Sequence, residues 1–122
     1  MAKINLLPRK EFEITISDGS VIRGQYGTWA LKRFCDKLGY SLKDAGAHLQ
    51  DPSLDEVVQY VLSAVEYPYA KKGDKCPYND VDVCDWIDQV GGIQSAEFSK
   101  LFAHSADEDN SQEKKTEDNP LS

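Results

Sequence analysis

Residues 53–67, SLDEVVQYVLSAVEY, decide the fold class of the chain. Apolar side chains recur in this stretch at positions i, i+3, i+4, i+7, i+8 and i+11, which is the spacing of one face of an α-helix. These are Leu54, Val57, Val58, Val61, Leu62 and Val65. Ser53 and Glu56 have the spacing of a capping box, which predicts a helix that begins directly after Ser53. Pro68 predicts that the helix ends or kinks there, because proline lacks an N–H and clashes with the preceding turn.

The stretch before this helix, residues 11–26, alternates between apolar and polar side chains, which is typical of half-buried strands. A three-residue Ser-Asp-Gly loop that ends at Gly19 joins the two strands. This loop sets Ile14 opposite Ile22, so that the apolar side chains share one face. A two-residue Asp-Gly turn would pair Ile14 with Arg23 and mix the two faces. We therefore expect a hairpin with the longer loop.

Helical spacing dominates the remaining chain. Further amphipathic segments are residues 28–38, a short stretch at 41–49, residues 79–90 and residues 95–104. The sequence thus predicts a mainly α protein of the α+β class, with a small N-terminal β-hairpin (residues 11–26) followed by four or five amphipathic helices within residues 28–102. Its 122 residues suit a single small domain, residues 11–102, after a flexible N-terminus at residues 1–10.

The last twenty residues have a different composition from the rest. Residues 103–122 contain no aromatic side chain, and Leu121 is their one large aliphatic. Their six carboxylates against two lysines supply −4 of the formal net charge of −7. Such a segment buries too little apolar surface to offset the entropy lost on ordering. We expect an acidic disordered tail.

The stretch NDVDVCDWIDQVGG, residues 79–92, is the strongest candidate for a metal site, through Asp80, Asp82, Cys84, Asp85 and Asp88. A calcium loop of the EF-hand type starting at its first aspartate needs a glycine at the sixth position and a glutamate at the twelfth. This chain has Asp85 at the sixth position and Gly91 at the twelfth. Val83, Trp86, Ile87 and Val90 have helical spacing instead. We therefore expect a packed helix with Trp86 buried and no metal.

Other catalytic or cofactor-binding patterns are missing from the sequence. Cys35, Cys76, Cys84, His48 and His104 form no CxxC or HxxxH pair that is typical of zinc sites. There is no GxSxG motif and no glycine-rich phosphate loop. We expect both histidines to be ordinary surface residues, and the protein to be no enzyme and to use no cofactor.

Aromatic residues are plentiful in and around the central helix: Tyr60, Tyr67, Tyr69 and Tyr78, with Trp29 and Trp86. Most such residues complete a small core, whereas exposed ones mark a partner-binding patch. The four tyrosines are the candidate binding residues. Among them we expect Tyr60 and Tyr69 to be the most exposed, since Tyr60 lies one position away from the apolar stripe and Tyr69 follows the proline.

The bulk properties restrict location and partners. A pI of about 4.7 argues against a nucleic-acid backbone or an anionic membrane as the main partner. No run of about 18 apolar residues is present to span a bilayer, and the N-terminus lacks the apolar region of a secretion signal. We expect a cytoplasmic protein with reduced thiols.

Three stretches together carry a family resemblance: SDGSVIRGQYGTWALKRFCDKLG (17–39), LSAVEYPYAKKG (62–73) and VDVCDWIDQVGG (81–92). Over about residues 10 to 103 the chain resembles the tail assembly chaperones of long-tailed bacteriophages and prophages. The resemblance implies a small, acidic, largely helical, non-enzymatic protein in the cytoplasm of the bacterial host cell. It also implies binding to the tape-measure protein, recruitment of tail-tube subunits and, in many members, a longer frameshifted form. It assigns no functional residue.

Two alternatives to a phage tail assembly chaperone follow from the residues. One is an acidic regulatory or anti-defence protein that imitates nucleic-acid charge and occupies a nucleic-acid-binding partner. The other is a metal-dependent enzyme or sensor built on the aspartates and the cysteine of residues 80–88.

Overall fold

The computed structural model describes residues 2–106, so the expected disorder of residues 107–122 lies outside the described part of the chain. The elements in chain order are β1 (Lys3–Leu6), a 3₁₀ turn η1 (Pro8–Lys10), β2 (Glu11–Thr15), β3 (Val21–Gln25), α1 (Thr28–Leu38), α2 (Leu42–Gln50), α3 (Leu54–Lys72), α4 (Asp80–Gln89), α5 (Ala96–Ala103) and a 3₁₀ turn η2 (His104–Ala106). The prediction of a small α+β domain, a hairpin followed by helices, is confirmed.

The hairpin has the expected register. Ile14 pairs with Ile22, and both side chains are buried. The backbone N–H of Ile16 donates to the carbonyl of Ser20 at 3.0 Å, which leaves a three-residue loop with Gly19 at φ 90°. The alternation of side chains along the strands therefore fixed the pairing, because any shift of one residue would expose the apolar face.

The N-terminus differs from the prediction. Instead of a flexible segment at residues 1–10, β1 adds a third antiparallel strand at the free edge of β2, with Ile4 opposite Ile14 and Leu6 opposite Phe12. A strand of four residues is too short to show a clear period, so the sequence pattern did not reveal it. Its place in the fold comes from backbone pairing with β2 and from packing beside α5.

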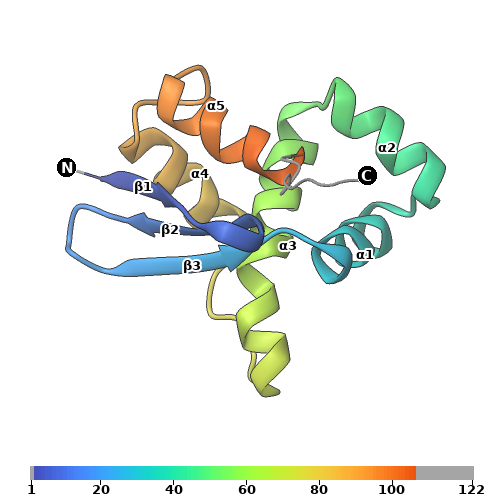
Figure 1. The fold of residues 1–122 in the computed structure, drawn as a ribbon, viewed down its shortest axis with the longest axis horizontal. Coiled ribbons are helices and arrows are strands. Elements are labelled where there is room, and N and C mark those ends of the chain that lie inside the picture. Colours follow the sequence, from blue (N-terminus) through green and yellow to red (C-terminus); the bar gives the residue numbers. More distant parts are fainter. Residues whose placement is uncertain (1, 107–122) are drawn as a thin grey trace, which may run out of the picture.

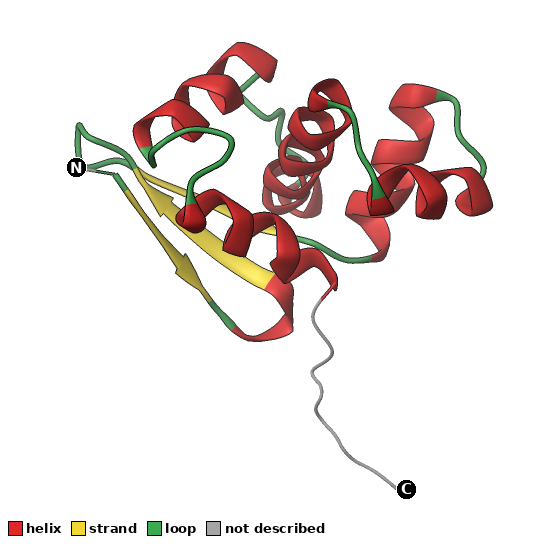
Figure 2. Ribbon diagram, turned by 90° about the horizontal axis from the view of Figure 1, so that it is seen from above, coloured by secondary structure: helices red, strands yellow, loops and turns green. Residues whose placement is uncertain are grey.

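Helix α3 forms the centre of the molecule. It packs against β3, α1 and α4, and between Glu56 and Val65 nearly every side chain is buried. In Figure 1 its first half lies among the other helices and the sheet, while its C-terminal half extends beyond them. The capping box at Ser53 is present, with Ser53 N donating to Glu56 Oε1 at 2.7 Å. Figure 2 shows the sheet on one side of the helices.

Of the two outcomes predicted at Pro68, an end or a kink of the helix, the end does not occur. Helix α3 continues to Lys72 and ends at Gly73, which has φ 78°. Proline removes one backbone hydrogen bond. Ring contacts of its neighbours offset this loss, since Tyr67 packs on Trp29 and Tyr69 on Tyr78. Tertiary contacts thus override the local signal for a helix end.

Helix α4 is the packed helix expected from residues 79–90. Asn79 and Asp82 form a reciprocal capping box, with bonds of 3.1 Å and 2.9 Å. Val83, Trp86 and Ile87 are buried, Trp86 with 4% of its surface exposed. The prediction of a buried Trp86 is confirmed.

The two histidines have different environments. His48 is exposed, as expected. His104 was expected at the surface, at the start of a disordered tail, but it is buried, and its Nε2 lies 2.9 Å from the carbonyl oxygens of both Leu7 and Glu11. Residues 103–106 are thus part of the domain, held against the β1–β2 connection. No helix within residues 2–106 is long and apolar enough to cross a lipid bilayer.

Candidate partner-binding surface

The structure separates Tyr60 from the other three candidate tyrosines. Its side chain is only 6% exposed and packs against Tyr26 and Phe34, with ring centroids 5.2 Å away in both cases. The expectation that Tyr60 is exposed is therefore wrong. Helix α3 is covered on several sides, so a position next to the apolar stripe is also buried.

Tyr67, Tyr69 and Tyr78 are half-buried and gather near the C-terminal half of α3. Tyr67 contacts Trp29 of α1 with ring centroids 5.9 Å apart. Tyr69 contacts Tyr78 at 6.1 Å, and Tyr78 meets the buried Trp86 edge-on at 5.0 Å. The rings therefore combine partial exposure with fixed positions, which suits contact with a partner at a low entropy cost.

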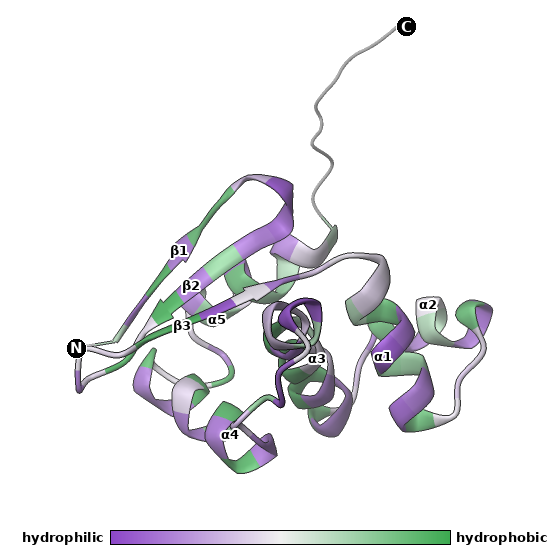
Figure 3. Ribbon diagram, turned by 90° about the horizontal axis from the view of Figure 1, so that it is seen from below, coloured by the Kyte–Doolittle hydropathy of each residue, from purple (hydrophilic) through white to green (hydrophobic). Residues whose placement is uncertain are grey.

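In the described part of the chain, three hollows adjoin Tyr67, Tyr78 or Trp29. The Trp29 hollow, of about 520 Å³, lies beside Trp29 and Tyr67. The strand hollow, of about 210 Å³, lies beside Tyr67 and Pro68. The Arg33 hollow, of about 400 Å³, lies beside Trp29 and Tyr78. Trp29 and Tyr67 each line two of the three. Viewed along α3 from its C-terminal end in Figure 3, this end of the helix is hydrophilic and lies between α1 and α4.

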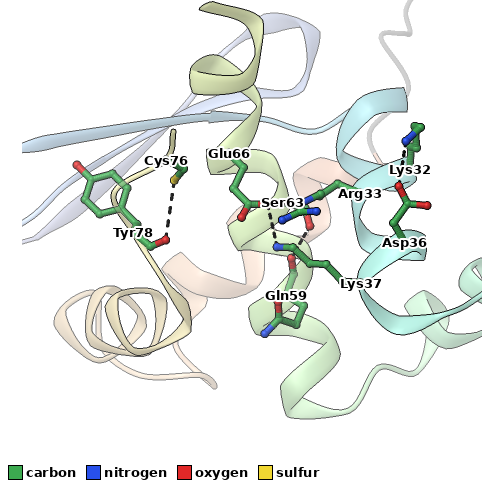
Figure 4. A network of polar contacts seen from close by, with 9 residues as sticks. All are labelled: Lys32, Arg33, Asp36, Lys37, Gln59, Ser63, Glu66, Cys76 and Tyr78. Carbon is green, nitrogen blue, oxygen red and sulfur yellow. Dashed lines mark hydrogen bonds and ion pairs between the residues drawn. The ribbon is translucent and has the colours of Figure 1, made fainter. Parts of the chain in front are cut away.

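A polar network lies next to the Arg33 hollow (Figure 4). Arg33 Nε and Lys37 Nζ both contact one oxygen, Oε1 of Glu66, at 3.1 Å and 2.9 Å. The side chain of Lys37 is 14% exposed, and burial lowers the pKa of its amine while Glu66 opposes this shift. Lys37 Nζ is close enough to Glu66 for an ion pair. Within residues 2–106, however, no acceptor has the geometry of a hydrogen bond to this nitrogen.

Cys76 and Tyr78 also belong to this wall of the hollow. Cys76 Sγ lies 4.0 Å from the carbonyl oxygen of Tyr78, and burial raises the pKa of the thiol. A thiol with a raised pKa is a weak nucleophile. Its role here is packing at the rim of the hollow.

A second polar cluster surrounds Glu56 at the other end of α3. Glu56 Oε2 accepts a hydrogen bond from the Tyr40 hydroxyl at 2.7 Å and lies 2.7 Å from His48 Nδ1. The rings of Tyr40 and His48 stack at 4.3 Å. The backbone N–H of Ser53, the Tyr40 hydroxyl and His48 lower the pKa of Glu56. This cluster joins α2 to the start of α3.

Three aspartates of α4 make hydrogen bonds within the helix or to its cap residue. Asp80 Oδ1 accepts from Val81 N at 3.0 Å, Asp82 caps the helix, and Asp85 Oδ2 accepts from Gln89 Nε2 at 2.8 Å. In the described part of the chain no three His, Cys, Asp or Glu side chains are grouped so as to hold a metal ion.

The sequence pattern does not identify Trp29, Arg33, Lys37 or Glu66 as candidate binding residues. Arg33 and Lys37 are four positions apart and share one face of α1, which the helical spacing does indicate. Their convergence on Glu66 depends on how α1 packs against α3, and no local pattern carries that information. Comparison with protein-family models, with curated proteins and with solved structures gives no match.

Proposed function

We propose that the protein is a non-enzymatic tail assembly chaperone of a long-tailed phage or prophage. It binds apolar helical segments of the tape-measure protein and helps to recruit tail-tube subunits. The resemblance over residues 10 to 103 supports this proposal. The surface around the C-terminal half of α3 supplies a place where a partner segment can bind.

One observation carries the binding role: Trp29 and Tyr67 form a fixed, half-exposed aromatic pair between the hollows. Aromatic side chains at such positions bury a large area for few rotatable bonds, and they dominate the energy of many interfaces. An amphipathic helix placed along α3 would cover both rings with its apolar face. The mechanism needs neither a nucleotide nor a metal.

The test is co-expression with the tape-measure protein encoded at the same locus. We expect the two proteins to co-purify, and the Trp29→Ala and Tyr67→Ala variants each to weaken binding by about tenfold or more, as is usual for interface aromatics. Val81→Ala is the control, because Val81 is 70% exposed and belongs to α4, whereas Trp29 and Tyr67 belong to α1 and α3. Loss of the tape-measure protein to the insoluble fraction, with wild-type chaperone present, would reject the proposal.

The alternative is an acidic binding protein that occupies a nucleic-acid-binding partner. Helix α4 favours it, since Asp80, Asp85 and Asp88 are exposed there and the helix carries no basic residue. Replacing these three aspartates by asparagine would abolish inhibition of a DNA-binding partner under this alternative. Under the chaperone proposal the same variant keeps its affinity for the tape-measure protein.

A further inference from the structure

We infer that the free edge of β3 binds an extended peptide segment of a partner protein as a fourth strand of the sheet, with alternate apolar side chains of that segment packed on the C-terminal half of α3. The proposed function concerns a helical segment, so this inference goes beyond it and does not depend on it. It names a second kind of ligand, which is recognised through its backbone.

β3 is an edge strand with unpaired backbone groups. The sheet has the order β1-β2-β3, and no other strand in the described part of the chain adjoins β3. Ser20 and Tyr26, which flank β3, both make backbone hydrogen bonds to residues that flank β2, at 3.0 Å and 3.1 Å. Hydrogen-bonded pairs alternate with non-bonded pairs in an antiparallel ladder. The backbone groups of Val21, Arg23 and Gln25 therefore point away from β2, towards the free edge.

The side chains along β3 leave this edge open. Val21 is 44% exposed, and the strand contains no proline or bulge that would block pairing. The side chain of Arg23 is 70% exposed and contacts Glu13 of β2 at 3.0 Å, so it lies over the sheet and not across the edge. The N–H and C=O groups of β3 that face outwards are thus available to a further strand.

The C-terminal half of α3 supplies a surface beside this edge. In Figure 1 α3 crosses β3 and extends beyond it, past the last strand of the sheet. The turns from Tyr67 to Lys72 cover about 9 Å, at about 1.5 Å per residue. This length exceeds the spacing of neighbouring strands, which is about 4.8 Å. This part of α3 therefore has room for one more strand.

The strand hollow lies where the added strand would run. Its walls include residues of both elements: Arg23, Gly24 and Gln25 from β3, and Tyr67, Pro68 and Lys71 from α3. The Trp29 hollow continues it past the end of β3, since Gln25 and Tyr67 line both hollows. Side chains of a strand point alternately to opposite faces. Those that face α3 meet the rings of Tyr67 and Pro68, and the others face solvent. The ligand is therefore an extended segment in which apolar and polar side chains alternate.

A second copy of this chain fits the edge less well than a peptide. Two β3 strands paired around a two-fold axis would place both α3 helices on the same face of the joined sheet. The inner face of β3 is already covered in each copy, with Ile22 only 2% exposed. The projecting turns of the other copy's α3 would meet that covering layer, whereas a peptide strand brings no helix with it.

The experiment uses a fluorescent synthetic peptide that alternates valine with threonine and lysine, and measures its binding to the full-length protein by anisotropy. Two further versions carry N-methyl groups on one or the other set of alternate residues. In an added strand only one of these sets donates to β3. We expect one methylated peptide to bind about as well as the unmodified peptide. The other is expected to bind at least about tenfold more weakly, because it lacks the donors that β3 needs.

Amide hydrogen exchange locates the bound strand. Binding of the peptide is expected to slow exchange at Val21, Arg23 and Gln25, whose N–H groups face the edge. We expect little change at Ile22 and Gly24, which already pair with β2. Equal slowing at all five residues would contradict strand addition.

A matched pair of variants tests the edge itself. Arg23→Pro removes the central N–H of the edge, and proline is tolerated on an edge strand where that group faces solvent. Arg23→Thr removes the same side chain, with its contact to Glu13, but keeps the N–H. We expect Arg23→Pro to weaken peptide binding by about tenfold or more, and Arg23→Thr to stay within about twofold of wild type. If Arg23→Pro does not fold, the two methylated peptides still decide.

Several results would overturn the inference. These are no measurable binding of the unmodified peptide, equal binding of the two methylated peptides, and unchanged binding by a folded Arg23→Pro variant. A dimer that forms without peptide and is lost in Arg23→Pro would also overturn it, because a second copy would then occupy the edge. Co-purification of the tape-measure protein tests the proposed function separately, since we expect Arg23→Pro to leave it intact and Trp29→Ala to weaken it.

Discussion

The ring of Phe12 on β2 lies directly against Gly24, its partner on β3. A Cβ added to Gly24 would stand 2.4 Å from Cζ of Phe12, whose side chain is 1% exposed. The glycine therefore leaves space for a neighbouring ring. A glycine that faces an aromatic ring fixes the register of a hairpin, because only glycine has no Cβ and so leaves room for the ring.

Replacement of Gly24 by alanine is expected to destabilise the protein by about 1–3 kcal/mol, the usual cost of overpacking a core. The matched control is Gly46→Ala in α2, where an added Cβ meets nothing within 4 Å. There we expect a gain of up to about 1 kcal/mol from helix propensity. Chemical denaturation of both variants checks the opposite signs, and equal effects would contradict this account of Gly24.

Much of the fold was predictable because the sequence signals were local and long enough. The alternation in residues 11–26 fixed Ile14 opposite Ile22, and the stripe from Leu54 to Val65 identified α3. β1 is too short to show a period, and Pro68 is overridden by the packing of its neighbours. Contacts between residues distant in sequence decide both the pairing of β1 and the continuation of α3 past Pro68. A local sequence pattern does not record such contacts.

Tyr26 carries a hydroxyl in an unfavourable place. Its side chain is 1% exposed, and within residues 2–106 the oxygen has no hydrogen-bond partner. Burial, with a smaller effect of Tyr60, raises the pKa of this hydroxyl well above its usual value. Tyr26→Phe removes the unsatisfied group and keeps the ring, so we expect a gain of about 1 kcal/mol or more in the free energy of unfolding. A measurable loss would show that the hydroxyl has a partner in solution.

Tyr40→Phe is the counterpart of Tyr26→Phe, and we expect it to change the stability in the opposite direction. The Tyr40 hydroxyl donates to Glu56 at 2.7 Å, and its removal takes one donor from that carboxylate. We expect the midpoint of thermal unfolding to fall for Tyr40→Phe and to rise for Tyr26→Phe. Measured side by side, the two variants separate the cost of burying a hydroxyl from the value of its hydrogen bond.

His104 joins the C-terminal end of the domain to the β1–β2 connection. Because both neighbours of Nε2 are carbonyl oxygens, that nitrogen carries the proton. His104→Ala is expected to destabilise the domain by about 1–3 kcal/mol and to speed amide exchange in β1. His48→Ala removes contacts of a half-exposed ring with Glu56 and Tyr40, and we expect it to cost less than His104→Ala. Equal losses in the two variants would contradict the assigned role of His104.

The candidate surface was harder to predict than the fold. Tyr67, Tyr69 and Tyr78 are near one another in sequence, so a simple aromatic cluster already identified the region. Trp29 comes from a helix that precedes α3 by many residues, and it reaches Tyr67 only through the packing of α1 on α3. The Arg33–Glu66 contact spans 33 positions for the same reason.

The pH dependence of stability tests the cluster around Glu56. The Ser53 backbone N–H, then the Tyr40 hydroxyl and the charge of His48, lower the pKa of Glu56 in the folded protein. A lowered pKa of Glu56 in the folded protein stabilises the fold at pH values above the unfolded pKa. This contribution is lost as the pH falls through the folded value.

Glu56→Gln keeps the size of the side chain and removes its charge. We therefore expect wild type to have a larger free energy of unfolding than Glu56→Gln at pH values above the usual glutamate range. This difference should shrink as the pH falls below the usual glutamate range of about 4.3. Denaturant unfolding across this range measures that difference, and the Tyr40→Phe background should reduce it. A difference that stays constant down to acidic pH would show that the cluster holds Glu56 through its shape alone.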